Sequence, residues 1–265
     1  MKQHEWHFRR CCRRRTGSRA TLGVFDGFED RRATLERVLE GEPDGVLASV
    51  PFLEQYEDVF AEYPDVYKIG TLDIIHDSTL PGHQGANEIH RQAFSLEQAD
   101  RAGADAVKVC VIYGRENPDV LGDNLEFAAR VAAEGRNHDL SVVLEPTLWG
   151  PRITDDLDAS FIEQAGRIGS ELGPDMLKLY YPGSSEAFEP VVANSPCPVY
   201  VAGGPKAERD HDVLEMTEGA VAAGSAGPIY GRNVWQHDDP AGMVSALKAI
   251  VHDGATAEEA LGRLE

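Results

Sequence analysis

The sequence predicts a single (β/α)8 TIM barrel over residues 21–265. From Thr21 onward, short β-branched runs alternate with longer amphipathic stretches, so that each of eight strands precedes a helix. The roughly 245 residues involved match the size of this fold, and no linker or low-complexity stretch divides them.

The candidate strands are short runs of aliphatic and β-branched residues. In chain order they cover residues 21–26, 45–50, 66–71, 106–113, 141–145, 175–180, 198–202 and 219–223. Amphipathic patterns between them predict helices near 30–40, 52–62, 95–103, 119–137, 157–172, 185–194, 206–216 and 240–252.

Capping signatures support several of these helix boundaries. Ser95 with Gln98 forms one capping box, and Thr256 with Glu259 opens a further short helix at the C-terminus. Gly103 is placed to end the helix that precedes the fourth strand.

An open doubly wound sheet is the alternative fold. That fold favours a glycine-rich phosphate fingerprint after the first strand, and the sequence GVFDGF at 23–28 contains none. The long connection at 72–94 follows the third strand and is predicted to be a loop or lid over the active face.

The charge of the chain excludes several functions. The net charge of -20 repels nucleic acid, and no apolar run is long enough to span a membrane. Residues 1–20 have a net charge of +6, and we expect them to form a basic, disordered N-terminal extension. We expect a cytoplasmic protein, and its acidic surface suits a cell interior of high salt.

Neither the cysteines nor the histidines predict a metal site or a cofactor. The four cysteines lack Cys-x-x-Cys spacing, and the nine histidines lie outside the candidate strands without an HExxH motif. His76 with Asp77, or His83 with His90, could serve as loop ligands, but packing or surface roles are more common for such residues.

The chain has six lysines, and three of them, Lys68, Lys108 and Lys178, lie inside predicted strands. Because strand residues alternate between two faces, the aliphatic residues of 106–113 and 175–180 leave Lys108 and Lys178 on the opposite face. The same alternation points Glu145 and Asp26 into the barrel, near the carboxyl ends of their strands.

Two lysines and two carboxylates that converge inside a barrel predict chemistry by a lysine amine. One such lysine alone is as often half of a buried ion pair, but burying several charges is costly unless they are paired. Desolvation and a neighbouring ammonium favour a neutral, nucleophilic amine near pH 7. Glu145, Asp26 or Tyr180 could shuttle the protons that Schiff-base chemistry requires.

Glycine-rich turns follow the last two predicted strands and predict a phosphate site. Backbone N–H groups of such turns can surround a phosphate, and an arginine adds positive charge. The candidate residues are Gly203, Gly204, Ser225, Ala226, Gly231 and Arg232.

Five blocks of the sequence resemble the class I (Schiff-base) aldolases of the DeoC/FbaB/LacD superfamily. This superfamily includes archaeal-type fructose-1,6-bisphosphate aldolase and tagatose-bisphosphate aldolase. The blocks are ADAVKVCVIYG, VVLEP, DMLKLYYPG, VYVAGGPK and AGSAGPIYGRNVWQHDDP. The resemblance runs from about residue 21 to the last residue.

The resemblance implies a role for each candidate residue. Lys178 matches the Schiff-base lysine, Lys108 the second active-site lysine, and Asp26 the acidic residue of the first strand. Glu145 is similar to the strand-5 acid of the tagatose branch. Gly203, Gly204 and Gly231-Arg232 fall where the family binds substrate phosphate, and the family commonly forms homo-oligomers.

Departures from the family pattern leave the substrate open. The segment after the fifth strand reads Glu-Pro-Thr-Leu-Trp-Gly, without the tyrosine of the fructose-bisphosphate branch. We predict a lyase that acts on a ketose (bis)phosphate and releases dihydroxyacetone phosphate or an analogue. The alternatives are a transaldolase-type synthase of 2-amino-3,7-dideoxy-heptulosonate, a phosphosugar isomerase, and a non-catalytic sugar-phosphate sensor.

Overall fold

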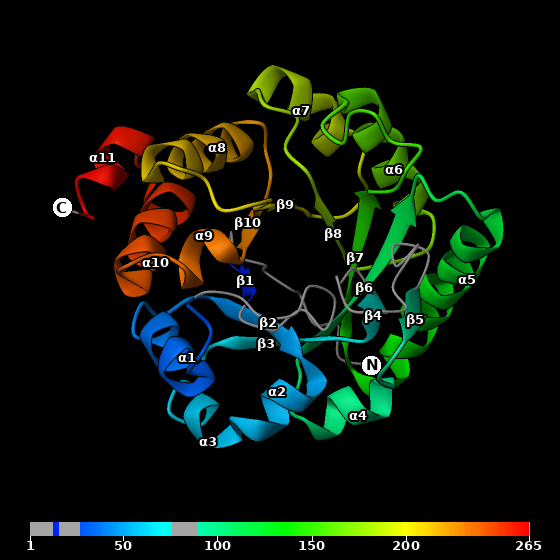
Figure 1. Cartoon of the computed structure of the whole chain (residues 1–265), viewed down its shortest axis with the longest axis horizontal. Coiled ribbons are helices and arrows are strands. Elements are labelled where there is room, and N and C mark those ends of the chain that lie inside the picture. Colours follow the sequence, from blue (N-terminus) through cyan, green and yellow to red (C-terminus); the bar gives the residue numbers. More distant parts are fainter. Residues whose placement is uncertain (1–12, 16–26, 76–89, 265) are drawn as a thin grey trace.

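A computed structural model describes residues 13–15, 27–75 and 90–264. Among these residues, eight parallel strands close into a barrel in the order β1-β10-β9-β8-β7-β6-β3-β2. Helices surround the strands (Figure 1). This architecture confirms the barrel that the sequence predicts.

Six of the barrel strands coincide with predicted runs. They are β2 (Gly45–Ser49), β3 (Tyr67–Thr71), β6 (Ala106–Tyr113), β7 (Ser141–Leu148), β8 (Met176–Leu179) and β9 (Val199–Ala202). The ladder between β6 and β7 runs in register from the pair Ala106 and Ser141 to the pair Tyr113 and Leu148. This ladder fixes the two strands on which most of the candidate site is built.

The first barrel strand lies earlier than predicted. Strand β1 is Arg13–Arg15, and it pairs with β2 on one side and β10 on the other. These residues belong to the segment 1–20 that the sequence analysis assigns to an extension, while the run 21–26 lies outside the described residues. Strand pairing uses backbone groups that every residue type carries, so a basic run gives no compositional sign of it.

The prediction of a strand at 219–223 is wrong. Residues 219–222 form the end of helix α8 (Asp210–Ala222), and Ala223 is its C-cap. Strand β10 follows at Gly227–Tyr230. The buried residues Val213, Leu214, Thr217 and Ala220 recur at helical spacing, and alanine favours a helix over a strand. The short alanine-rich run therefore continues the helix.

The other helices follow the predicted pattern. They are α1 (Arg31–Leu39), α2 (Val50–Gln55), α3 (Glu57–Phe60), α4 (Leu96–Arg101), α5 (Pro118–Gly135), α6 (Ala159–Ser170), α7 (Ser185–Ala193), α9 (Arg232–Trp235), α10 (Pro240–Lys248) and α11 (Ala257–Leu261). Both predicted capping boxes form, at Ser95 and at Thr256. Gly103 has a φ of 67°, as a glycine that ends a helix requires.

One layer of side chains fills the lower part of the barrel interior. Seven strands each contribute one apolar residue to it: Leu47, Ile69, Ala106, Val143, Met176, Tyr200 and Ile229. Their strand neighbours, such as Val107, Leu144 and Leu177, pack outward against the helices. Two residues further along β6, β7 and β8, the next inward positions are Lys108, Glu145 and Lys178.

Candidate active site

Three of the predicted residues meet inside the barrel. Lys178 Nζ donates to Glu145 Oε1, and Lys108 Nζ lies 3.3 Å from Glu145 Oε2. Lys178 is 2 % exposed, Lys108 3 % and Glu145 6 %. The single carboxylate of Glu145 therefore bridges two buried amines, as the alternation of β6, β7 and β8 predicts.

Cys110 closes this cluster on the side of the barrel mouth. Its Sγ accepts from Lys108 Nζ at 2.9 Å and donates to Glu145 Oε2 at 3.3 Å. The thiol is buried against Ile75, Ile112 and the partly buried Trp149. An apolar cluster thus adjoins the Glu145 carboxylate through Cys110.

A second carboxylate, Asp73, was not predicted from the sequence and lies in the same cluster. It lies on β4 (Asp73–Ile75), which forms a two-stranded antiparallel sheet with β5 (His90–Gln92). Asp73 Oδ1 lies 3.2 Å from Lys108 Nζ and accepts from Thr71 Oγ1 at 3.0 Å. The predicted loop at 72–94 therefore begins and ends in strands, and residues 76–89 lie outside the described part of the chain.

His90 contacts Asp73, and Asn124 contacts His90 in turn. His90 Nε2 lies 2.9 Å from Asp73 Oδ2, and His90 Nδ1 contacts Asn124 Oδ1 on helix α5. The backbone N–H of Cys110 donates to the same Asp73 oxygen at 2.5 Å. His90 is 1 % exposed and Asn124 2 %, so this chain of polar groups is shielded from water over its length.

Asp73 stays ionised in this setting. Burial raises the pKa of its carboxyl, but the Lys108 ammonium and the hydrogen bond from His90 outweigh burial and hold the pKa far below its usual range. The carboxylate is a fixed negative charge beside Lys108. The sequence signal was weak, since Asp73 follows the predicted third strand without a motif around it.

The two turns that follow β9 and β10 lie against each other. Arg232 donates to the carbonyl oxygen of Gly204 at 2.8 Å, and Asn233 Nδ2 donates to that of Gly203 at 2.8 Å. A Cβ at position 203 would lie 2.7 Å from the ring of Tyr230, and Gly204 has a φ of 59°, so both positions favour glycine. The structure thus brings Gly203, Gly204 and Arg232 together at the carboxyl ends of these strands.

The assignment of Ser225 and Ala226 to this phosphate site is wrong. Because β10 begins at Gly227, both residues lie before the strand, at the end of the barrel opposite to Gly231. The N–H of Ser225 donates to Ala220 and that of Ala226 to Val199, so neither is available to an anion. The misplaced eighth strand caused this error.

Arg115 follows strand β6, and Trp149 follows strand β7. Arg115 is 6 % exposed, and its guanidinium carbon lies 5.8 Å from the centre of the Trp149 ring. Burial raises the pKa of Tyr113, the last residue of β6, to about 12. The second predicted carboxylate, Asp26, lies outside the described residues.

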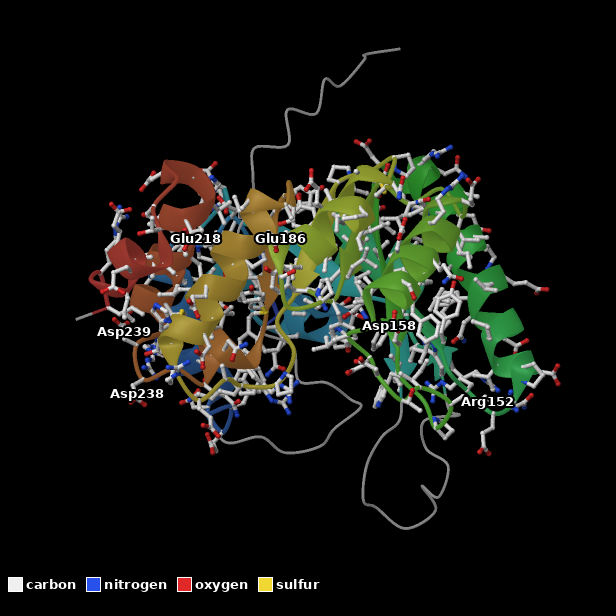
Figure 2. All side chains as sticks on the ribbon, turned by 90° about the horizontal axis from the view of Figure 1, so that it is seen from above. Arg152, Asp158, Glu186, Glu218, Asp238 and Asp239 are labelled. Atoms are coloured by element: carbon white, nitrogen blue, oxygen red, sulfur yellow. The ribbon has the colours of Figure 1, made fainter. Side chains whose placement is uncertain are left out.

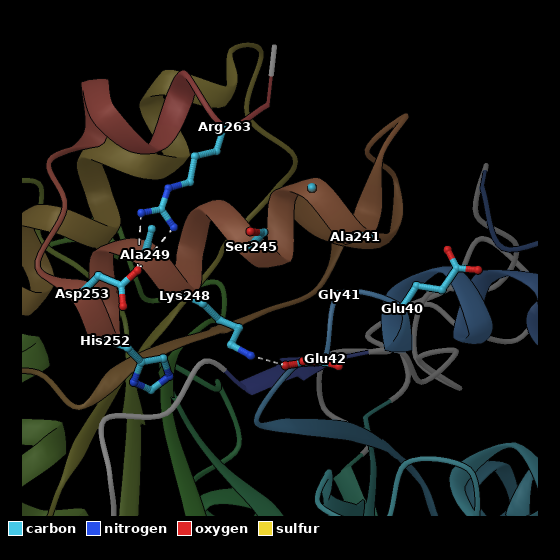
Figure 3. A pocket seen from close by; sticks show the side chains of 11 residues that line it. Glu40, Gly41, Glu42, Ala241, Ser245, Lys248, Ala249, His252, Asp253 and Arg263 are labelled. Carbon is cyan, nitrogen blue, oxygen red and sulfur yellow. Dashed lines mark hydrogen bonds and ion pairs between the residues drawn. The ribbon is translucent and has the colours of Figure 1, made fainter.

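A pocket of about 530 Å³ lies elsewhere, between the end of α1 and helix α10 (Figure 3). Two of its cations are engaged: Lys248 Nζ donates to the Glu42 backbone carbonyl at 2.7 Å, and Arg263 pairs with Asp253 at 3.3 Å. None of the predicted site residues lines it. We assign it no function.

The described residues contain one group with the composition of a metal site, His211, Asp212 and Glu215 at the start of α8. His211 Nδ1 lies 3.3 Å from Glu215 and its Nε2 lies 3.8 Å from Glu258, which is an ordinary surface ion-pair arrangement. In the described part of the chain, no helix has the length and apolarity needed to cross a membrane.

Residues 11–237 match the model of the DeoC/LacD family of aldolases. The chain belongs to this family. It is therefore an aldolase of the lyase class, as the sequence resemblance implied.

Two relatives from Halobacterium salinarum carry different names. A 2-amino-3,7-dideoxy-D-threo-hept-6-ulosonate synthase is 34% identical over 243 residues, which cover 92% of this chain and 87% of the relative. A class 1 fructose-bisphosphate aldolase is 38% identical over 173 residues, 64% of each chain.

A solved structure of the same fold contains a covalent intermediate. It is an archaeal fructose-1,6-bisphosphate aldolase with its catalytic lysine bound to the carbinolamine intermediate of the substrate. It superimposes with a TM-score of 0.78 at 26% identity, and the match covers 92% of this chain and 95% of that one.

Proposed function

We propose that this aldolase cleaves and forms a C–C bond of a ketose phosphate through a Schiff base on Lys178. The observation that carries the proposal is the buried contact between Lys178 Nζ and Glu145 Oε1, with Lys108 against the second carboxylate oxygen. The solved relative with a covalently bound lysine supports it.

The contact between Lys178 and Glu145 supplies the first step. Glu145 accepts the proton of the Lys178 ammonium, and the neutral amine then attacks the ketose carbonyl carbon. Loss of water from the carbinolamine gives an iminium, and Glu145 is positioned beside Nζ to deliver the proton that this water needs.

The iminium then acts as the electron sink for bond cleavage. A base takes the proton of the C4 hydroxyl, the C3–C4 bond breaks, and its electrons move into the enamine. Protonation at C3 and hydrolysis release dihydroxyacetone phosphate or an analogue. Glu145 fits the role of base, because it is the carboxylate beside the reacting nitrogen.

The turns after β9 and β10 fit the substrate phosphate. Gly203 and Gly204 offer backbone groups without side chains, and Arg232 places a guanidinium across the same turns. Strand β8, which carries Lys178, is the direct neighbour of β9. A phosphate bound at these turns would place the adjoining carbons of the ketose near Lys178.

A transaldolase-type synthase is the second candidate. It is favoured by the heptulosonate synthase from Halobacterium salinarum, whose similarity extends over 92% of this chain. Such an enzyme uses the same lysine but passes the enamine to a second carbonyl compound.

A cytoplasmic location and a homo-oligomeric assembly remain part of the proposal.

Borohydride reduction tests the covalent step. With dihydroxyacetone phosphate, reduction should leave a stable mass increment on the tryptic peptide that contains Lys178, and K178M should leave none. The matched control is K248M, which removes a lysine on the outer helix α10 and should be trapped like the wild type. An active K178M variant would overturn the mechanism.

A product assay then separates the two candidates. Cleavage of ketose mono- or bisphosphates without an acceptor would identify an aldolase. Turnover that requires a second carbonyl acceptor would identify the synthase. Wild-type protein that cannot be trapped with any ketose phosphate would favour an isomerase or a sugar-phosphate sensor.

A further inference from the structure

Lys108 lies between two carboxylates, of which the proposed reaction uses only one. Its Nζ is 3.3 Å from Glu145 Oε2 and 3.2 Å from Asp73 Oδ1. Both carboxylates and the ammonium are more than nine-tenths buried. Lys108 therefore divides its contacts between Asp73 and Glu145.

The charges of the cluster suggest how they are divided. Among the described residues two amines face two carboxylates, and each buried charge is costly unless an opposite charge accompanies it. If Asp73 balances Lys108, then Glu145 balances Lys178. One proton can then pass between Glu145 and Lys178 in either direction without leaving an unbalanced charge in the barrel.

We propose that Asp73 is a positioning residue of this reaction: it holds the Lys108 ammonium and so leaves Glu145 able to exchange its proton with Lys178. The inference rests on the proposed function of Lys178. Asp73 touches neither Lys178 nor the reacting atoms in this arrangement, and it acts through Lys108.

Asp73 has hydrogen-bond partners in addition to its ion pair with Lys108. Thr71 Oγ1 donates to Oδ1, and the Cys110 N–H and His90 Nε2 approach Oδ2. Asn124 of helix α5 fixes the other side of the His90 ring. A chain of buried polar groups thus runs from an outer helix through β5 and β4 to the amine on β6.

Without Asp73, Lys108 Nζ keeps its contact with Glu145 Oε2 at 3.3 Å. The ammonium would then stabilise Glu145 in its ionised form and oppose its protonation. The titratable groups that face Asp73 and Glu145 in the described chain are Lys108 and Cys110 of β6, Lys178 of β8 and His90 of β5. Loss of one negative charge from this set makes every remaining proton easier to lose.

The decisive variant is D73N, which keeps the shape of the side chain and removes its charge. We expect kcat to fall about 10- to 100-fold while KM changes by less than about twofold, because phosphate binding is remote from Asp73. Both limbs of the pH profile of kcat should move to lower pH by about one unit. The rate of borohydride trapping should fall in parallel.

The control is D105N, which removes a carboxylate whose Oδ2 accepts from the Lys68 backbone N–H at 2.8 Å outside the barrel interior. It should retain the wild-type pH profile even if it lowers stability. A D73N enzyme with the wild-type pH profile would overturn the inference, as would an equal shift in D105N.

His90 provides a second test if D73N does not fold. H90Q retains a donor toward Asp73 and should keep most of the activity, whereas H90L should lower kcat and shift the pH profile as D73N does. Equal behaviour of the two variants would contradict the inference. Failure of wild-type trapping would instead reject the proposed function, so the two failures are distinguishable.

Discussion

At the scale of single residues, Glu145 links most of the candidate chemistry. Its two carboxylate oxygens face different lysines, Cys110 Sγ donates to Oε2, and Thr147 Oγ1 donates to the backbone carbonyl oxygen of Glu145. Burial of such a carboxylate is tolerated because both oxygens have charged partners. The same burial makes its proton exchange with Lys178 sensitive to each neighbouring charge.

E145Q tests the role of this carboxylate. The amide preserves volume but cannot take or return a proton, so kcat should fall by about 10² to 10⁴. Binding of a phosphate-bearing inhibitor should change by less than about threefold, since Gly204 and Arg232 are untouched. Steady-state kinetics and isothermal titration measure the two effects, and an unchanged kcat would reassign the proton shuttle.

At the scale of elements, the ends of β6 and β7 set the shape of the barrel mouth. The chain turns at Gly114 and Gly150 where these strands end, and Trp149 N–H donates to the Tyr113 carbonyl at 3.0 Å. A Cβ at position 150 would lie 2.2 Å from the Gly114 carbonyl oxygen. Only a residue without a side chain allows this approach of two backbones.

G150A should therefore lower the free energy of unfolding by about 1–3 kcal/mol, because the backbone of one strand end must move. It should also weaken activity, since Trp149 packs over Cys110. G122A is the matched control: nothing lies within 4 Å of its added Cβ on helix α5, and alanine should stabilise that helix by up to about 1 kcal/mol. Urea denaturation measures both, and a destabilised G122A with an unchanged G150A would contradict the reasoning.

At the scale of the whole molecule, the charge is separated by depth. The chain has a net charge of -20, and acidic side chains such as Glu186, Asp238 and Asp239 are exposed on its outer surface (Figure 2). The interior cluster, in contrast, pairs its charges. Repulsion among the surface carboxylates opposes the compact state at low ionic strength.

Added salt should therefore stabilise the protein. Raising KCl from 0.1 to 2 M shortens the Debye length from about 10 Å to under 3 Å and screens the surface carboxylates. We expect Tm to rise by several degrees. Chloride is used because sulfate would also strengthen the burial of apolar surface and so obscure the effect of charge screening. Differential scanning calorimetry measures the change, and a Tm that falls with KCl would contradict the role of surface repulsion.

The fold and much of the site were predictable because they depend on local patterns. The alternation in AVKVCVIY and DMLKLY places Lys108 and Lys178 on inward faces, and the register of parallel strands then brings them to Glu145. The eighth strand was not predictable in this way. Periodicity over so short an apolar run fits a buried strand as well as a helix, and the helix preference of alanine is only a weak prior, so the packing of α8 decides between them.

The sequence by itself determined the barrel, the inward lysines and the glycine turns after β9 and β10, because periodicity and turn chemistry act over a few residues. The tertiary structure alone decided that Asp73 and His90 join the lysines and that Ser225 and Ala226 do not join the phosphate turns. These contacts span up to 35 residues between Asp73 and Lys108. They depend on how β4 folds over β6 and on where β10 begins, which no local pattern records.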